Sequence, residues 1–243
     1  MYINAVIKTQ EPNDERDAYL NAIPAIAALQ TLPLQKPVTF LVGENGSGKS
    51  TLLEAIAVSF GFNPEGGSRN FNFRSVETHS GLYELLRLVR GVKRPKDDFF
   101  LRAESFYNVA SEVDRLAGDP ADPFLDSYGS KSLHAQSHGE SFLSLMLNRF
   151  RGNGLYLLDE PEAALSPSRQ MTLLACMHSL VQKQSQFIIA THSPILMAYP
   201  DAQILLLSDD GLQPIGYKQT EHYQITRSFL ENPERMLRVL MED

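Results

Sequence analysis

The chain alternates short apolar runs with longer stretches in which apolar residues recur at helical spacing. Four of the runs are almost wholly apolar, at residues 38–42, 155–158, 187–190 and 204–207. Such runs are typical of strands that are buried on both faces of a sheet. Helical stretches follow three of them, at residues 49–60, 168–184 and 194–198. Strand and helix in this alternation predict an α/β fold, in which helices flank a mostly parallel sheet.

Weaker patterns between these runs predict the remaining elements. Residues 1–8 alternate like a strand, with Ile3, Ala5 and Ile7 on one side. A further strand is predicted at residues 98–106, and helices at residues 82–89, 109–116, 141–150 and 221–240, the last interrupted at residues 232–233. A hairpin turn is predicted at residues 209–211 and a loop at residues 118–132. Residues 19–32 fit a short helix or a strand equally well.

A glycine-rich turn joins the apolar run at residues 38–42 to the helical stretch at residues 49–60. Its sequence, G-E-N-G-S-G-K-S, fits the phosphate-binding P-loop pattern GxxxxGK[ST]. Glycine readily takes the left-handed backbone angles that turn several N–H groups inward, and these groups form a pocket for anionic oxygens. Lys49 is then expected at the terminal phosphates and the Ser50 hydroxyl at Mg²⁺. The expected nucleotide-binding residues are Glu44, Asn45, Gly46, Ser47, Gly48, Lys49, Ser50 and Thr51.

Polar residues follow two of the other apolar runs. Asp159 and Glu160 come directly after residues 155–158, and His192 follows residues 187–190. An open parallel sheet binds its ligands at the carboxyl ends of its strands, so we expect these side chains near the glycine-rich turn. Asp159 suits the Mg²⁺ shell, Glu160 the polarisation of an attacking water, and His192 a hydrogen bond to a γ-phosphate. A polar strand end before a turn is the alternative interpretation of D-E-P.

Length and composition limit the classes of protein. A chain of 243 residues with 43% hydrophobic content can bury a substantial core, and we expect one domain over residues 1–243. The single cysteine, Cys176, excludes an intrachain disulfide, and the apolar periodicity around it predicts a core position. No signal peptide is recognisable, and no run approaches the roughly 18 apolar residues that span a bilayer. We therefore expect a cytoplasmic protein.

The charge distribution bears on nucleic-acid binding. A net charge of −7 argues against uniform, charge-driven binding to nucleic acid. Five basic residues nevertheless cluster without an acid, namely Arg87, Arg90, Lys93, Arg94 and Lys96. They form either a patch that faces nucleic acid or a partner, or the solvated basic end of the helix predicted at residues 82–89. We favour the second interpretation.

The order of these motifs resembles the ATPase domain of the ABC superfamily, in which a P-loop is followed by D-E-P and then by T-H-S. Members also carry a short signature between the first two motifs. Residues 137–141, S-H-G-E-S, resemble the S-G-G-E form of the SMC/RecF-like branch, with His138 in place of a glycine. Residues 160–167, E-P-E-A-A-L-S-P, resemble the family's dimer-contacting loop, with Ser166 where transporters have aspartate. No glutamine lies between Ser50 and Ala135, so the family's glutamine loop is not assigned.

The resemblance implies a small stand-alone ABC-type ATPase with ATP and Mg²⁺ as cofactors. It also implies that residues 1–243 form one ABC-type domain, with a small insertion or helical region at about residues 62–135. In that family the signature of one subunit closes over the γ-phosphate in the other, which assigns Ser137, Gly139 and Glu140 to nucleotide binding in an ATP-bound homodimer.

The implied function is an ATPase whose dimer closes on ATP and opens on hydrolysis. This cycle would drive a separate partner, either a nucleic-acid-processing protein or an effector, including a defence effector. Two alternatives stay open. The first is the ATP-binding subunit of a membrane transporter, for a chain in which we expect no membrane segment of its own. The second is a nucleotide-binding scaffold with little turnover.

Overall fold

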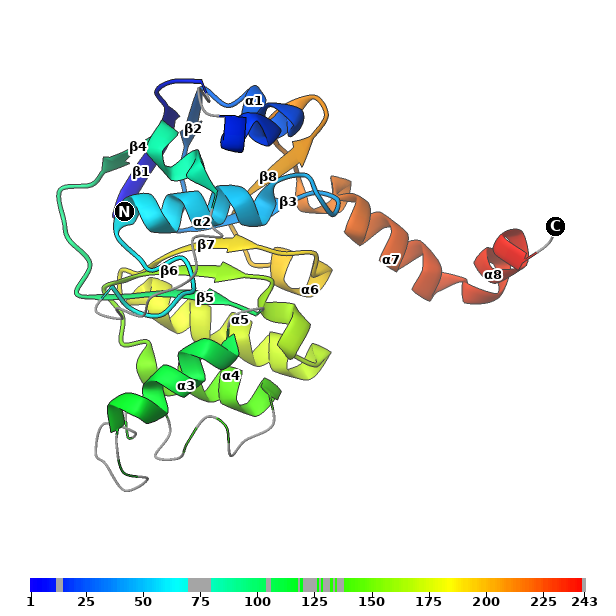
Figure 1. The fold of residues 1–243 in the computed structure, drawn as a ribbon. Helices are drawn as coiled ribbons and strands as arrows, with labels where there is room; N and C mark the ends of the chain where they lie inside the picture. Colours follow the sequence, from blue (N-terminus) through cyan, green and yellow to red (C-terminus); the bar gives the residue numbers. More distant parts are fainter. Residues whose placement is uncertain are drawn as a thin grey trace.

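A computed structural model of the protein describes residues 1–11, 15–69, 80–103, 106–117, 119, 126, 128, 132, 134 and 138–241. A six-stranded sheet with the order β5-β6-β7-β3-β8-β9 forms its centre (Figure 1). The strands are β3 (Val38–Val42), β5 (Asp97–Arg102), β6 (Gly154–Asp159), β7 (Gln186–Ala190), β8 (Gln203–Ser208) and β9 (Gly211–Pro214). All neighbouring strands pair in parallel except β8 and β9, which form the predicted hairpin.

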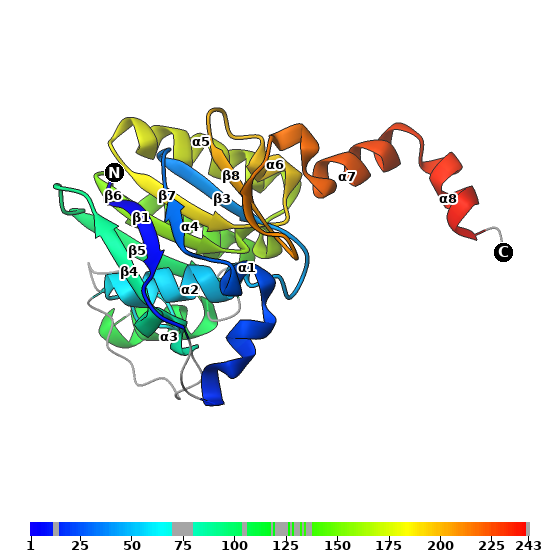
Figure 2. The ribbon, with the colours of Figure 1, turned by 90° about the horizontal axis from the view of Figure 1, so that it is seen from above.

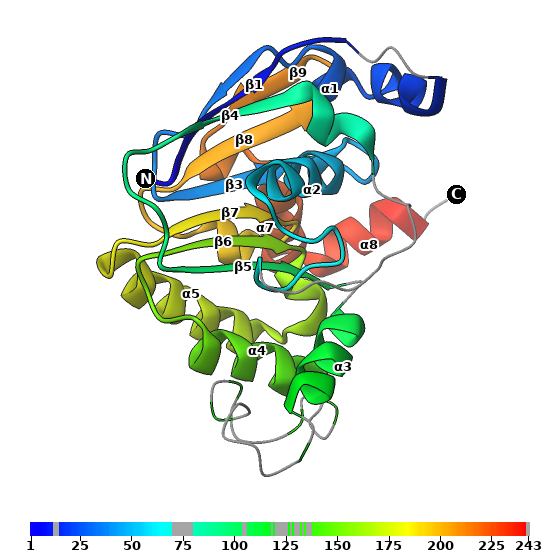
Figure 3. The ribbon, with the colours of Figure 1, turned by 60° about the vertical axis from the view of Figure 1, so that its left-hand side comes forward.

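A second, antiparallel sheet with the order β2-β1-β4 lies beside α2, on one face of the central sheet (Figure 3). Its strands are β1 (Ile3–Lys8), β2 (Thr31–Pro33) and β4 (Leu86–Arg90). The α-helices are α1 (Pro24–Ala27), α2 (Lys49–Phe60), α3 (Phe106–Ala117), α4 (His138–Arg149), α5 (Pro167–Gln182), α6 (Pro194–Met197), α7 (Glu221–Glu231) and α8 (Pro233–Met241). Short 3₁₀ helices are η1 (Glu15–Ala22), η2 (Gly81–Leu85), η5 (Pro161–Ala164) and η6 (Tyr217–Gln219).

Two hydrophobic cores cover the two faces of the central sheet. Successive side chains of a strand point to opposite faces, so Phe40 joins the core beneath α3, α4 and α5, whereas Leu41 joins the core beneath α2. Both side chains are completely buried. This two-sided burial explains the unbroken apolar runs, and the α/β fold predicted from them is confirmed. None of the helices within the described ranges is long and apolar enough to cross a membrane.

The helix predicted at residues 82–89 is wrong. Its first part is η2, and its second part is β4, which pairs antiparallel with β1 so that Ile7 faces Arg87. The sequence L-R-L-V-R alternates with the period of a strand, and the edge of β1 supplies the hydrogen-bonding partner that the local sequence does not reveal. The basic residues of this region therefore lie on a strand and the connection after it, so the interpretation of a basic helix end is also wrong.

The strand predicted at residues 1–8 is confirmed as β1, but Ile3, Ala5 and Ile7 do not share one buried side. Ile3 and Val6 are completely buried, whereas Ala5 and Ile7 are only partly buried. The register of β1 against β4 shifts between Ile3 and Ala5. An irregularity of this kind moves the following side chains to the other face, so strict alternation fails.

The C-terminal helices α7 and α8 project away from the rest of the molecule, as Figures 1 and 2 show, and together are called the arm. Their predicted interruption is confirmed, because α7 ends at Glu231 and α8 begins at Pro233. No residue of either helix is buried. Apolar side chains are exposed along the arm, with exposed fractions of 54% for Ile225, 71% for Leu230 and 73% for Leu240.

A buried hydrogen-bond network fixes the amino end of β6. The Tyr156 hydroxyl donates to Asp97 Oδ2 at 2.7 Å and accepts from the Gly152 N–H at 3.2 Å. Arg149 also pairs with Asp97. Burial and the negative charge of Asp97 raise the pKa of Tyr156 well above its ordinary value, so the phenol stays protonated and donates.

We expect Tyr156→Phe to lower the free energy of unfolding by about 1–3 kcal/mol, because the Asp97 carboxylate loses one buried donor while Arg149 remains. The ring keeps its stacking on Phe150, whose centroid lies 4.2 Å away. Urea unfolding followed by circular dichroism measures the change. Tyr19→Phe is the control, since Tyr19 is 47% exposed and its change should be near zero. Equal stability of Tyr156→Phe and wild type would contradict the importance of this network.

Candidate functional site

The P-loop (residues 43–50) runs from the end of β3 to the start of α2. Gly43 and Gly48 have φ of 148° and 93°, which L-residues with side chains rarely adopt. A Cβ on Gly43 would lie 2.4 Å from the Leu207 carbonyl oxygen, and one on Gly48 would lie 2.8 Å from Ile23 Cγ2. Both positions therefore require glycine. The predicted helix at residues 49–60 is confirmed as α2, and it directs its amino end into this loop.

Lys49 lies within the P-loop with only 4% of its surface exposed. Its Nζ donates to the carbonyl oxygens of Gly43 at 2.9 Å and Glu44 at 2.7 Å. Burial lowers the pKa of Lys49, and the negative charges of nearby carboxylates, Glu160 first, oppose that shift. A buried cation that donates to backbone carbonyls is suited to bind phosphate oxygens that enter the loop.

Ser50 and Asp159 meet across the sheet edge. The Ser50 hydroxyl donates to Asp159 Oδ1 at 2.9 Å, which joins the start of α2 to the end of β6. Mg²⁺ prefers oxygen ligands and is usually held by one or two carboxylates together with substrate phosphates. A hydroxyl and a carboxylate beside a phosphate loop fit that requirement. Among the described residues, no group of three or more His, Cys, Asp or Glu side chains forms a separate metal site.

Glu160 and His192 follow the ends of the neighbouring strands β6 and β7. Glu160 has a left-handed backbone, with φ of 48° and ψ of 51°, and its N–H donates to the Ala190 carbonyl at 2.9 Å. The His192 Nε2 lies 3.6 Å from Glu160 Oε1. The strained backbone of Glu160 is of a kind that clusters at active sites. The Glu160 side chain is 42% exposed, and its negative charge acts on Lys49 of the P-loop.

The imidazole of His192 is neutral near pH 7. Burial, the positive charge of Lys49 and the neighbouring His222 lower the pKa of His192 to about 4. Its Nδ1 lies 2.8 Å from His222 Nε2, a hydrogen-bonding distance. A neutral imidazole presents one N–H and one lone pair, so the partner of one nitrogen decides what the other offers.

Several residues of the site were missed by sequence reasoning. Glu162 Oε1 accepts a hydrogen bond from the backbone N–H of His192, which links the segment after β7 to η5. Burial raises the pKa of the Glu162 carboxyl. Arg102, at the end of β5, pairs with Glu54, and its Nε lies 3.7 Å from Asp159 Oδ2. The position of Glu162 in D-E-P-E, two residues after Glu160, could have indicated a place near the site. The sequence carries no signal for the pairing of Arg102.

Two residues of the predicted signature, Gly139 and Glu140, lie in α4, which packs on the face of the central sheet opposite α2. Ser137 lies outside the described residues. Gly139 is in the first turn of α4, on the opposite face of the sheet from α2, where a Cβ would lie 2.4 Å from the Ala164 carbonyl oxygen. Glu140 pairs with Arg169 at 3.2 Å. The close approach of Gly139 to Ala164 packs α4 against η5. The role of the signature in nucleotide binding stays a prediction.

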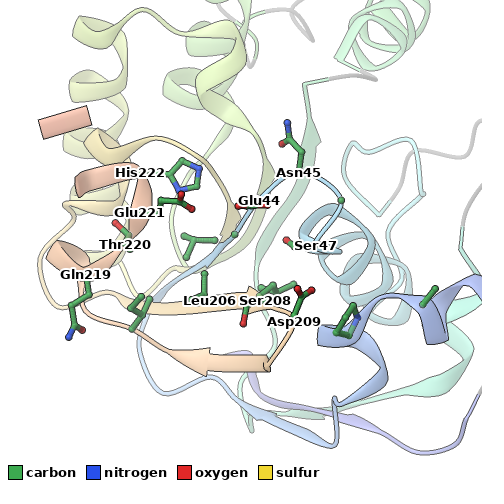
Figure 4. A pocket seen from close by; sticks show the side chains of 17 residues that line it. Glu44, Asn45, Ser47, Leu206, Ser208, Asp209, Gln219, Thr220, Glu221 and His222 are labelled. Atoms are coloured by element: carbon green, nitrogen blue, oxygen red, sulfur yellow. The ribbon is translucent and has the colours of Figure 1, made fainter. Parts of the chain in front are cut away.

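A cavity of about 520 Å³ opens beside the P-loop (Figure 4). Glu44, Asn45 and Ser47 line one side of it, and Glu221 and His222 line another. The end of β8 and the turn after it contribute the floor, with Ser208 and Asp209. The start of the arm thus borders the same hollow as the phosphate loop.

Two known protein families match the parts of the chain that carry the candidate site. Residues 20–105 match the family described as "AAA domain", and residues 87–198 match "AAA domain, putative AbiEii toxin, Type IV TA system". A protein of Caldanaerobacter subterraneus subsp. tengcongensis, named a putative ABC transporter ATP-binding protein, is 28% identical over 216 residues. That similarity covers 82% of this chain and 87% of the relative.

Solved structures share the fold. The structure of cbiO1 from Clostridium perfringens, part of the ABC transporter complex cbiONQ, has a TM-score of 0.52 at 17% identity, over the whole of this chain and 99% of that one. The structure of a nucleotide-free ATP-binding cassette from an ABC transporter has a TM-score of 0.50 at 16% identity, over the whole of both chains. The chain therefore resembles AAA-domain ATPases over residues 20–198 and has the α/β fold of ABC-type P-loop ATPases. The resemblance to the ABC superfamily is confirmed, and the SMC/RecF-like branch stays a prediction.

Proposed function

We propose that the protein binds Mg-ATP at the P-loop and hydrolyses it to ADP and phosphate. The observation that carries the proposal is the convergence of the buried Lys49, the Ser50–Asp159 hydrogen bond and the Glu160–His192 pair at one edge of the sheet. Phosphoryl transfer to water needs positive charge at the phosphates, oxygen ligands for the metal and a group that orients the water. These side chains supply the three requirements.

Each side chain has a separate role in this proposal. Lys49 exchanges its carbonyl partners for phosphate oxygens. Ser50 and Asp159 hold Mg²⁺, which neutralises charge on the phosphates when it is bound. Glu160 accepts a proton from the attacking water, since its carboxylate is partly exposed at the edge. His192 donates a hydrogen bond to the terminal phosphate through Nε2.

We further propose that ATP joins two copies of the chain. The support is the position of Gly139, which packs on the Ala164 carbonyl on the face opposite α2 and so lies apart from the P-loop of its own chain. A signature that contacts ATP therefore belongs to a second copy, and two identical sites follow from a two-fold axis. ATP closes this dimer and hydrolysis opens it.

We expect the wild-type protein to be monomeric or weakly dimeric without nucleotide and to dimerise with Mg-ATP. The γ-phosphate supplies contacts to both copies, whereas ADP lacks them. Sedimentation velocity without nucleotide, with ADP and with a non-hydrolysable ATP analogue measures this, together with phosphate release. A stable dimer without nucleotide would contradict the cycle, and an absence of phosphate release would contradict the enzymatic proposal.

The ATP-binding subunit of a membrane transporter is the second candidate. The observation that favours it is the name of the relative from Caldanaerobacter, an ABC transporter ATP-binding protein. The family that matches residues 87–198 is described as a putative AbiEii toxin of a Type IV TA system, and this description favours an effector partner. Capture of an integral membrane protein by the ATP-locked form would support the transporter, and stimulation of the ATPase by nucleic acid would support the nucleic-acid-processing partner.

A further inference from the structure

Among the described residues of the arm, His222 is the one that hydrogen-bonds to a side chain of the candidate site. It lies in the first turn of α7, and its Nε2 is 2.8 Å from His192 Nδ1. The two rings meet at an interplanar angle of 63°, with centroids 4.9 Å apart. A second hollow is lined by both histidines together with Glu44 and Asn45 of the P-loop. The contact therefore belongs to the nucleotide edge of the sheet.

The hydrogen bond must have one donor and one acceptor. Burial lowers the pKa of both His192 and His222, so both rings are neutral near pH 7. If His192 donated through Nδ1, its Nε2 would present a lone pair to the Glu160 carboxylate at 3.6 Å and to any phosphate nearby. Two acceptors facing each other repel. The favoured arrangement has His222 as donor and leaves His192 with an N–H at Nε2.

The Nε2 of His192 is shielded from solvent and has no hydrogen-bond partner among the described residues. A buried polar atom without a hydrogen-bond partner is destabilising unless a ligand supplies that partner. An N–H at this point, beside Lys49 and the P-loop, is suited to an anionic oxygen. We propose that His222 is a positioning residue, which sets the tautomer and the ring orientation of His192 so that Nε2–H faces the terminal phosphate.

A second contact fastens the start of the arm to the same segment. Tyr217 Oη donates to the Pro194 carbonyl at 3.0 Å, two residues after His192. Thr220 is buried and its hydroxyl donates to the Tyr217 carbonyl at 2.8 Å, which fixes the turn that leads into α7. The orientation of the His192 ring and the start of the arm are thus held by one set of contacts. This inference rests on the proposed ATPase function and adds a residue to it.

The test measures the tautomer of His192 directly, by the ¹⁵N chemical shifts of its imidazole in the nucleotide-free protein near pH 7. The wild type should show a protonated Nε2 and a bare Nδ1, and His222→Ala should show a mixture of tautomers. His222→Gln keeps an amide N–H within reach of Nδ1 and should restore the wild-type shifts. His178→Ala is the control, because His178 is exposed on α5. Comparison with His192→Gln assigns the signals.

Kinetics give the second readout. We expect His222→Ala to lower kcat about 10-fold with little change in KM, and His222→Gln to recover most of the loss. Unchanged His192 shifts in His222→Ala would overturn the inference whatever the activity. A wild type without ATPase activity would overturn the proposed function instead, while the ¹⁵N shifts would still decide whether His222 positions His192.

Discussion

Glu160→Gln is expected to bind ATP and Mg²⁺ but to release phosphate about 10² to 10⁴-fold more slowly than wild type. Glutamine keeps the shape and hydrogen-bonding reach of Glu160 but cannot accept a proton from water. The carboxylate stands 3.6 Å from His192 Nε2 and is partly open to the edge where ATP would bind. Because opening of the dimer depends on hydrolysis, a closed dimer should accumulate with ATP.

Asp159→Asn provides the matched contrast. The Asp159 carboxylate accepts the Ser50 hydroxyl and has Arg102 nearby, so its loss weakens the Mg²⁺ site rather than the proton acceptor. We expect impaired ATP binding and no stable closed dimer. Phosphate release and sedimentation are measured for both variants and for Glu84→Gln, an exposed glutamate on η2 that should behave as wild type.

Two outcomes would contradict these roles. Wild-type turnover in Glu160→Gln would remove that residue from the chemistry. If Asp159→Asn formed an ATP-bound dimer as stable as that of Glu160→Gln, the two carboxylates would not have the separate roles proposed here.

Lys49→Ala is expected to weaken ATP binding by about 2–5 kcal/mol, or roughly 30- to several thousand-fold, as is typical when one partner of a buried charge pair is removed. Lys49 is the residue whose ammonium group lies inside the P-loop, 2.7 Å from the Glu44 carbonyl oxygen. Without it the phosphates would meet the backbone N–H groups alone, close to the negative charges of Asp159 and Glu160. Isothermal titration calorimetry with Mg-ATP measures the loss.

Lys36→Ala is the control for this measurement, because Lys36 is exposed and lies before β3, at the other end of the strand that leads into the P-loop. Both variants change the net charge equally. A thermal melt without nucleotide separates loss of binding from loss of folding. Unchanged ATP affinity in a folded Lys49→Ala would contradict the assignment of the P-loop.

The part of the site that could be predicted from sequence is the part that local sequence controls. The two ends of α2 at Lys49 and Phe60 follow from adjacent glycines, since Gly48 and Gly61 both have left-handed backbones. The apolar runs identify the strands of the central sheet because those strands are buried on both faces. Asp159 and His192 are found at the ends of such runs, so their shared edge follows from the parallel fold.

Contacts between distant segments needed the tertiary structure. Residues 86–90 form a strand because β1, about 80 positions away, offers an edge to pair with. Arg102 meets Glu54 and Asp159 only because β5 ends beside α2 and β6. His222 reaches His192 because the chain turns at η6 before the arm begins.

The fold class, the phosphate loop and the strand ends that carry Asp159, Glu160 and His192 could therefore be predicted from the sequence. These depend on periodicity and on glycines within a few residues. The strand β4, the ion pairs of Arg102 and the contact of His222 with His192 became visible only in the folded chain. Those depend on which surfaces meet once the two cores are packed, and the partners of a hydrogen bond or an ion pair carry no mark of one another in a single sequence.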